Sequence, residues 1–464
     1  MKRRNFGLLT SAVALGAGLG FPKGARAAVS AAQAAQLKTT LTPFGSERAG
    51  NTDGSIPAWA GGYTQVPSGW ASPALMPDLF PGDQPVVTIS ASNMEQYTDK
   101  LAYSVQQMIQ RYGQSLVVYP TRRTAAAPQW VYDNIYQNAL NAQAAVGGAR
   151  MGVINAYGGI PFPILSSDPA EAGAEVMQNH CCRWNGLQEV RYGDNFLVQN
   201  GQVIEVVDYH KYNIWPYYQK NGSLATFSGW YEEELFHPIA PPNAVGGDIL
   251  AYQGVNPVLF KDSGWELLTG QGRVRRIPEI EYDVPISSFD GIINYDEAYG
   301  FYGALDEYNW NLVGKKEIYI PYNNNKLQFA AFSDVGPHFF NPDIIRWELH
   351  RVWIVDAVVA PRRHNVVARR RFYVDEDAWT VALSDEYDAQ GNFWRTSQVF
   401  LTCRPDLPGS IIQTWATNNV QNDSFAINLG PKLGVPPSQR QQDYITPIPA
   451  SEFNPQDMAA RGAF

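Results

Sequence analysis

The chain has few of the residues that build disulfide frameworks and metal centres. Its 464 residues include only three cysteines and six histidines. Three cysteines cannot form a disulfide framework that stabilises a chain of this length, so a hydrophobic core must stabilise the fold. Cys181 and Cys182 are adjacent and lack the spacing of a zinc-binding pair, so we predict no metal and no cofactor. A disulfide from either to Cys403 and burial as small apolar side chains both remain open.

The sequence also lacks the motifs of the common enzyme classes. It contains no Gly-x-Ser-x-Gly nucleophile elbow, no His-Glu-x-x-His pair and no phosphate-binding Gly-x-x-x-x-Gly-Lys loop. Glu348, His350 and Asp356 share one parity of a predicted strand and could act as an acid–base group, but no activated nucleophile accompanies them. We therefore predict a protein that is not an enzyme.

Positive charge is scarce beyond the first 27 residues. The whole chain carries a formal net charge of −9, and residues 1–27 hold five basic residues and no acidic one, so the remainder carries −14 (−9 − 5). Such a charge repels polyanions, which argues against nucleic-acid binding. No later segment reaches the roughly 18 consecutive apolar residues of a membrane-spanning helix. With 13 Trp, 25 Tyr and 21 Phe, the chain has ample material for a folded core.

Residues 1–27 have the pattern of a signal peptide. Basic residues at 2–4 precede an apolar run at 8–19, and Ala-Arg-Ala at 25–27 offers a cleavage site of small residues. Arg-Arg-Asn-Phe at 3–6 resembles a twin-arginine export signal, and a general secretion signal would use similar chemistry. No cysteine stands at the cleavage site to carry a lipid. We predict a mature periplasmic protein without a transmembrane span, and peripheral association with the outer membrane stays open.

The clearest structural pattern is a succession of four strands between Arg346 and Cys403. Apolar residues occupy the odd positions from Trp347 to Val359 except Arg351, whereas polar residues such as Glu348 occupy half of the even ones. Turn-forming residues separate this strand from the next three. The alternation predicts an antiparallel meander with one apolar face and one solvated face.

Helical patterns precede strand patterns along the chain. Apolar spacings of three and four predict helices near 92–112 and 128–146, with a shorter helix at 171–184. This order favours an α+β fold with one large antiparallel sheet in one elaborated domain. We divide the chain into a signal peptide (1–27), an extended loop region (28–90), a helical segment packing on the sheet (91–185), the sheet (186–416) and an irregular tail (417–464).

Five short segments carry a family resemblance. They are Leu-Thr-Pro-Phe-Gly-Ser-Glu-Arg-Ala-Gly at 41–50, Gly-Arg-Val-Arg-Arg at 272–276, Leu-Val-Gly-Lys-Lys-Glu at 312–317, Tyr-Ile-Pro-Tyr-Asn at 319–323 and Glu-Leu-His-Arg-Val-Trp at 348–353. Together they resemble the Gram-negative family called domain of unknown function thirteen-twenty-nine. The strands and turns of 372–391 are also similar to those of the lipoprotein-sorting carriers LolA and LolB.

This resemblance implies a large curved antiparallel sheet, or half barrel, with helices packed over its concave face and an apolar cavity between them. It further implies a carrier or accessory role for a hydrophobic, lipid-like molecule in an envelope transport pathway. An exporter or an outer-membrane protein would be the partner. The alternative is a structural scaffold that docks on such a partner, with a filled core and no ligand.

The candidate ligand-binding residues are the side chains on the apolar face of the meander, together with two residues of an earlier strand. Each buried CH₂ contributes roughly 0.8 kcal/mol, so an apolar wall binds an acyl chain without any catalytic group. The alternative is that these side chains fill an ordinary core. The candidates are Trp265, Leu267, Trp347, Leu349, Trp353, Val355, Phe372, Trp379, Val381 and Leu383.

Basic residues gather on the hairpin between the first two strands of the meander. They form a candidate docking site for a lipid headgroup or an acidic partner. Edge charges that discourage aggregation are the alternative. Arg370 shares the parity of Phe372, so we predict that it points inward and meets a carboxylate. The outward set is Arg362, Arg363, His364, Arg369 and Arg371.

Overall fold

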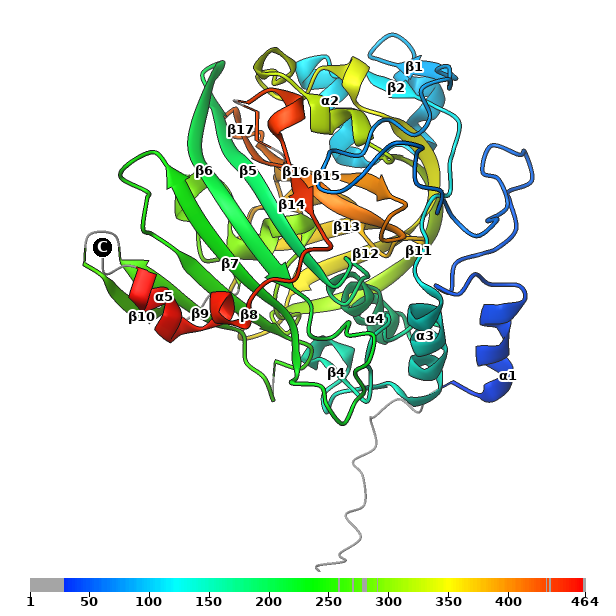
Figure 1. The fold of residues 1–464 in the computed structure, drawn as a ribbon. Helices are drawn as coiled ribbons and strands as arrows, with labels where there is room; N and C mark the ends of the chain where they lie inside the picture. The colour runs from blue at the N-terminus through cyan, green and yellow to red at the C-terminus, as the bar shows by residue number, and fades with distance from the viewer. Residues whose placement is uncertain are drawn as a thin grey trace, which may run out of the picture.

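A mostly antiparallel 16-stranded sheet forms the body of the protein (Figure 1). The computed structural model describes residues 29–461 except 258, 269–270, 278–281, 290, 431 and 434. The predicted signal peptide at 1–27 lies outside the described residues. Within the described part of the chain, no helix has the length and apolar character needed to cross a membrane.

The sheet runs in the order β1-β2-β12-β13-β14-β15-β16-β17-β5-β6-β7-β8-β9-β10, with β11 paired to β12 and β18 paired to β5. Among the described strands, only the short contact between β2 and β12 is parallel. A separate pair joins β3 (Gln143–Ala144) to β4 (Val153–Ile154). The strands are β1 (Val87–Ile89), β2 (Leu116–Val118), β5 (Gln188–Gln199), β6 (Gln202–Ile214), β7 (Trp230–Ala240), β8 (Ile249–Gly254), β9 (Ser263–Leu268), β10 (Arg273–Ile277), β11 (Tyr308–Pro321), β12 (Trp347–Val359), β13 (Arg369–Asp375), β14 (Val381–Tyr387), β15 (Phe393–Arg404), β16 (Gly409–Asn419), β17 (Ser424–Leu429) and β18 (Gln442–Asp443).

The helices are few and short compared with the strands. The α-helices are α1 (Ala31–Ala34), α2 (Tyr103–Tyr112), α3 (Gln129–Asn141), α4 (Pro169–Cys181) and α5 (Pro455–Arg461). The 3₁₀ helices are η1 (Ala35–Lys38), η2 (Met94–Lys100), η3 (Ala149–Met151), η4 (Ser287–Phe289), η5 (Tyr295–Gly300), η6 (Asn325–Phe329), η7 (Phe332–Asp334), η8 (Pro342–Ile344), η9 (Pro437–Gln439) and η10 (Ala450–Phe453).

The predicted meander is present as β12 to β15, each strand antiparallel to the next. The sheet then continues through β16 and β17 and joins β5, so the strands of both halves of the chain form one surface. β17, β18 and α5 lie within residues 417–464, which the sequence predicted to be an irregular tail. That prediction is wrong because this segment pairs with a distant strand, and pairing of this kind leaves little local signal.

The meander is buried on both faces, which corrects the prediction of a solvated face. Val352 and Ile354 pack in one core cluster with residues of α2, whereas Val355 and Ala357 pack in a second cluster with residues of α3 and α4. Even the charged Glu348 is fully buried. Alternation identifies which side chains share a face, but it does not reveal that a second layer covers the polar face.

Helix α4 begins and packs through identifiable residues. Asp168 caps its N-terminus by accepting a hydrogen bond from Ala170 N–H at 2.9 Å, and Pro169 occupies the first turn. Gly173 lets the helix approach β11 closely, since a Cβ there would lie 2.8 Å from Asn311 N and 2.9 Å from Leu312 N. This approach presses α4 onto the strand next to the meander (Figure 1).

Gly173→Ala is therefore expected to destabilise the protein by about 1–3 kcal/mol, because backbone atoms of β11 cannot move aside as a side chain would. That loss outweighs the gain of about 1 kcal/mol in helix propensity. The measurement is the free energy of unfolding in urea. Gly82→Ala is the matched control: no atom lies within 4 Å of a Cβ there, so this change should be close to neutral. Equal effects of the two substitutions would contradict the close approach.

Candidate ligand cavity

A cavity of about 470 Å³ lies between one face of β6–β9 and the segment 286–302. Its volume is within the range of about 300–1,000 Å³ that is typical of small-molecule sites. Side chains from β5, β16 and β17 complete its wall, and residues 241–247 border it. The principal apolar lining residues are Val206, Val207, Phe236, Ile249, Phe289 and Trp415.

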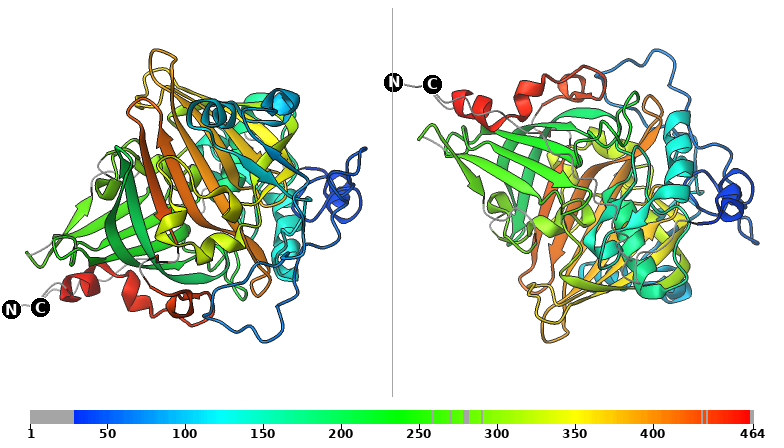
Figure 2. Two further views of the ribbon diagram at one scale, coloured as in Figure 1. Left: turned by 90° about the horizontal axis from the view of Figure 1, so that it is seen from above. Right: turned by 90° about the horizontal axis from the view of Figure 1, so that it is seen from below.

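Strand register determines which side chains of β7–β9 reach the cavity. Phe236 pairs with Ile249, and Ile249 pairs with Glu266, so these three share the cavity face. Leu235 and Leu250 form the neighbouring pair and therefore point to the opposite face. There they pack with residues of η10 and α5, which lie along the outer side of the strands (Figure 2).

A bulge in β6 sends two successive side chains into the cavity. Asn195 of β5 pairs with Val207, and the next β5 residue, Phe196, pairs with Glu205. Val206 is thus the extra residue on β6 and has no partner in the register. Such a bulge turns adjacent side chains toward the same face of a sheet. Val206 and Val207 both line the cavity as a result.

A polar group interrupts the apolar lining where β6 meets η5. Lys211 Nζ donates to the Tyr299 hydroxyl at 2.6 Å and to Glu234 Oε2 at 3.3 Å, and the Tyr299 hydroxyl donates to the same carboxylate at 3.0 Å. Tyr299 has φ 56°, a left-handed conformation that is strained for an aromatic residue. This triangle gives a bound molecule a place for one polar group.

A small polar chamber lies behind this triangle and shares Lys211, Tyr299 and Tyr302 with the cavity. Arg191 donates to both carboxylate oxygens of Glu189, at 2.9 and 3.0 Å, so these buried charges neutralise each other. Burial raises the pKa of Glu232 in the same chamber to about 7. Buried polar groups therefore line the small chamber, and the apolar surface lies in the cavity of about 470 Å³.

The family model described as "Protein of unknown function (DUF1329)" matches residues 88–459. An uncharacterised protein of Pseudomonas aeruginosa is 37% identical over 384 residues, which cover 80% of this chain and 81% of that protein. This chain belongs to the DUF1329 family. The resemblance noted in the sequence is confirmed by these matches.

Three solved structures resemble parts of this DUF1329 protein. One, from Vibrio parahaemolyticus, is named for outer membrane lipoprotein sorting; it is 14% identical, has a TM-score of 0.43, and covers 62% of this chain and 99% of its own. A DUF1329 family protein from Desulfovibrio piger is 14% identical and has a TM-score of 0.42; the match covers 62% of this chain and 98% of that protein's chain. A LolA superfamily protein from Nitrosomonas europaea is 8% identical and has a TM-score of 0.33; the match covers 62% of this chain and 98% of that protein's chain. The strand order of the 16-stranded sheet rests on the strand pairing of this chain itself.

None of the ten predicted ligand residues lines the cavity. The meander residues Trp347, Leu349 and Leu383 pack in one core cluster; Val355, Phe372, Trp379 and Val381 pack in the other, with Trp353 at its edge. Trp265 and Leu267 pack on the outer face with the residues of η10 and α5. The C-terminal segment thus covers the face of β9 that carries the bulky side chains Trp265 and Leu267, and the face that carries Glu266 borders the cavity.

The helices α2 and α4 pack on the sheet, but on other strands than those that border the cavity. α4 packs against β11 and β12, and α2 packs against β14. The face of β6–β9 that borders the cavity is covered by the segment 286–302, which contains η4 and η5. A signal for this cover exists in the sequence, since the segment carries several aromatic residues between two strands, but its short turns have no helical periodicity.

The predicted basic hairpin is largely paired within the protein. Arg371 donates to both oxygens of Asp356 at 2.6 and 2.8 Å, and Arg363 lies 2.7 Å from Asp306. The Arg369 guanidinium stacks 3.7 Å from the centroid of the Tyr387 ring. Arg362 and His364 are exposed, with 87% of the His364 side chain accessible. The docking role of this hairpin stays a prediction, with Arg362 and His364 as its most accessible members.

Arg370 points inward, as predicted from its parity. Its side chain is fully buried, and its Nη2 lies 2.8 Å from Asp296 Oδ2. The expected carboxylate partner is thus Asp296, from η5 of the segment that covers the cavity. All three cysteines are free, and burial raises the pKa of the Cys403 thiol to about 12.

Proposed function

We propose that this DUF1329 protein binds a hydrophobic, lipid-like molecule in the cavity between β6–β9 and the segment 286–302, and acts as a carrier without catalytic activity. The observation that carries the proposal is the cavity itself, with a volume of about 470 Å³ and a mostly apolar lining. Burial of ten methylene groups in it contributes ~8 kcal/mol before the cost of ordering the ligand. Without that cost the energy would correspond to a Kd of about 1 μM, so the cost of ordering the ligand makes binding weaker than this limit.

The finer features of the proposal follow from the same geometry. The strands β6–β9 form the wall of a half barrel, and Lys211 with Tyr299 meets the polar group of the ligand. The export pattern of residues 1–27 supports a periplasmic location and an envelope transport pathway. An exporter or an outer-membrane protein is the proposed partner, and Arg362 and His364 are the proposed contact. The scaffold alternative requires a filled core, and the cavity weighs against it.

Filling the cavity tests the proposal. Ala251 lines it from β8, so Ala251→Trp should weaken binding of a fluorescent fatty-acid probe at least ten-fold without loss of the folded state. Val203→Trp, at an exposed position of the β5–β6 hairpin, is the matched control and should leave binding unchanged. Thermal unfolding of both variants separates loss of binding from loss of fold.

Native mass spectrometry of the protein purified from the cell envelope supplies an independent readout. A co-purifying lipid-like mass, absent from the Ala251→Trp variant, is the expected result. Unchanged probe binding in that variant, together with no co-purifying mass in the unmodified protein, would overturn the carrier proposal and favour the scaffold.

A further inference from the structure

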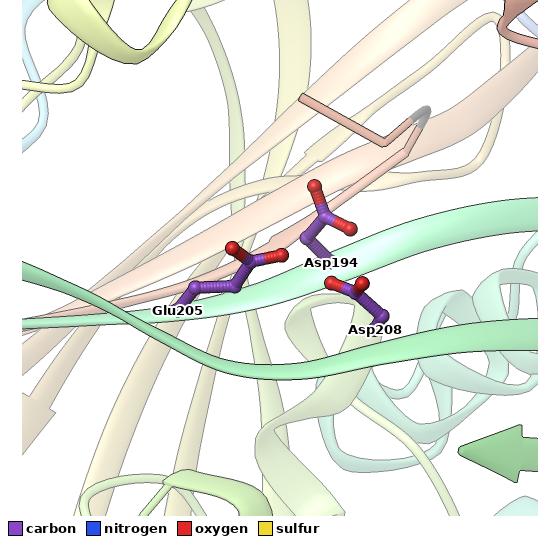
Figure 3. A group of neighbouring side chains, drawn as sticks. All are labelled: Asp194, Glu205 and Asp208. Carbon is purple, nitrogen blue, oxygen red and sulfur yellow. The ribbon is translucent and has the colours of Figure 1, made fainter. Parts of the chain in front are cut away.

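Three carboxylates converge on the β5–β6 pair. Asp194, Glu205 and Asp208 each place an oxygen within 4.8 Å of the others, and Figure 3 shows their side chains pointing toward one another. Asp194 comes from β5, and the other two come from β6. Asp194 pairs directly with Asp208 across the two strands.

The β6 bulge is the reason for this convergence. Glu205 and Asp208 are three residues apart, so in a regular strand they would point to opposite faces. The extra residue Val206 restores them to the same face. Val206 and Val207 line the cavity and the three carboxylates do not, so the acids occupy the back of the cavity wall.

The acids of the cluster outnumber the cations in direct contact with them. Among the described residues, Lys432 Nζ contacts Asp208 Oδ2, so direct contacts comprise three carboxylates and one ammonium, an excess of two negative charges. The Arg440 guanidinium also acts electrostatically on Asp194. Leu433 N–H donates to Asp194 Oδ2 at 2.5 Å. With all three acids ionised, Asp194 Oδ1 and Asp208 Oδ1 are buried and have no hydrogen-bond donor.

These two oxygens are the independent sign of a missing ligand. Asp194 is fully buried and Asp208 is 8% exposed, and a buried acceptor left without a donor destabilises a folded protein.

We propose that Asp194, Glu205 and Asp208 bind a calcium ion. All three ligands are carboxylate oxygens, the donors that hard divalent cations prefer. Calcium–oxygen distances of about 2.3–2.6 Å allow two oxygens on one ion to lie up to about 5.2 Å apart, which accommodates the observed cluster. Magnesium, with distances of about 2.0–2.1 Å, requires its oxygens to lie within about 4.2 Å of one another, which is a tighter arrangement than the 4.8 Å limit on this cluster guarantees.

Charge and access fit the same ion. Two positive charges match the excess of two negative charges that remains after Lys432 is counted. Glu205 is exposed, so the ion reaches the buried pair from the surface. Bound there, calcium supplies the missing partner to Asp194 Oδ1 and Asp208 Oδ1 and holds the bulge that places Val206 and Val207 in the cavity. The site itself does not depend on what the cavity binds.

Calcium titration of the chelator-treated full chain tests the site. Calcium chloride should raise the unfolding temperature by several degrees beyond sodium chloride of equal ionic strength, and calorimetry should give one ion per chain. Glu205→Gln, at the exposed ligand, should weaken calcium binding at least ten-fold in a folded protein. Glu95→Gln, an exposed acid of η2, is the matched control and should bind calcium like the unmodified chain.

Lys432→Met separates calcium binding from simple charge pairing. If the acids hold calcium, removal of the competing ammonium should tighten calcium binding. If they serve only as counter-ions of Lys432, this variant should be less stable and should not respond to calcium, which would overturn the proposal. Absence of calcium binding in the unmodified chain, or equal binding by Glu205→Gln, would overturn it as well. An equal response to magnesium would overturn the assignment to calcium.

Discussion

Replacement of Arg370 by methionine is expected to lower the free energy of unfolding by about 3–5 kcal/mol, because it leaves the carboxylate of Asp296 buried without its counter-charge. The guanidinium is fully buried, 2.8 Å from that carboxylate, and its carbon lies 5.3 Å from the centroid of the Tyr308 ring. Methionine can replace the apolar contacts of the side chain but not its charge. Urea unfolding followed by tryptophan fluorescence measures the change.

The neighbouring residue provides the matched control. Arg371 pairs with Asp356 through hydrogen bonds to both carboxylate oxygens, but 37% of the Arg371 side chain is exposed. Solvent therefore screens this pair and hydrates Asp356 after the substitution. Arg371→Met should therefore change the free energy of unfolding by about 1 kcal/mol or less. Equal losses in the two variants would show that burial does not distinguish the two pairs, contrary to the structure.

His350 should make the stability of the protein depend on pH. Its Nε2 lies 3.1 Å from Glu348 Oε2, its Nδ1 lies 3.4 Å from Asp375 Oδ1, and its ring stacks on Tyr322 at 4.0 Å between centroids. Burial disfavours the imidazolium, but hydrogen bonds to Asp375 and Glu348 outweigh it and raise the pKa of His350 to about 9. Glu348 and His350, which the sequence offered as part of an acid–base group, thus belong to a buried ion-pair network, whereas the third residue of that group, Asp356, pairs with Arg371.

The sign follows from the direction of this pKa shift. The folded state holds the proton more tightly than the unfolded state, whose histidine has a pKa of about 6.5. The stabilisation is therefore fully present below about pH 6.5 and is lost as pH rises through about 9. A shift from 6.5 to about 9 corresponds to about 3 kcal/mol.

The measurement is the free energy of unfolding of the unmodified protein and of His350→Gln at about pH 6 and about pH 9.5. The advantage of the unmodified protein should be large at the lower pH and should shrink at the higher pH. His364→Gln, at a residue with 87% of its side chain exposed, is the control and should show no such trend. A constant difference between the unmodified protein and His350→Gln would contradict the ion-pair network.

Local patterns in the sequence predicted the elements that depend on neighbouring residues. The alternation between Arg346 and Cys403 predicted four strands, and β12 to β15 occupy that region. The parity of Arg370 predicted its inward direction and its carboxylate partner. Both predictions rest on the two-residue period of a strand, which is a property of the backbone and needs no knowledge of the rest of the fold.

The sequence predicted the cavity in the wrong place because the alternation of side chains along a strand does not reveal which segment covers each face. On β9, Trp265 and Leu267 form the more apolar parity, yet η10 and α5, almost two hundred residues later, cover that side. Glu266 on the other parity borders the cavity. The β6 bulge was also beyond local patterns, since the register shift at Val206 exists only when β6 is paired with β5.

By itself, the sequence determined the family, the α+β class, the four-strand meander and the inward arginine, because short-range periodicity and family motifs are carried by residues close together in the chain. Only the tertiary structure decided which faces are filled and which enclose a cavity, because distant segments compete for the same apolar faces. It also decided that Asp194, Glu205 and Asp208 meet, because that convergence depends on one unpaired residue in the register of two strands.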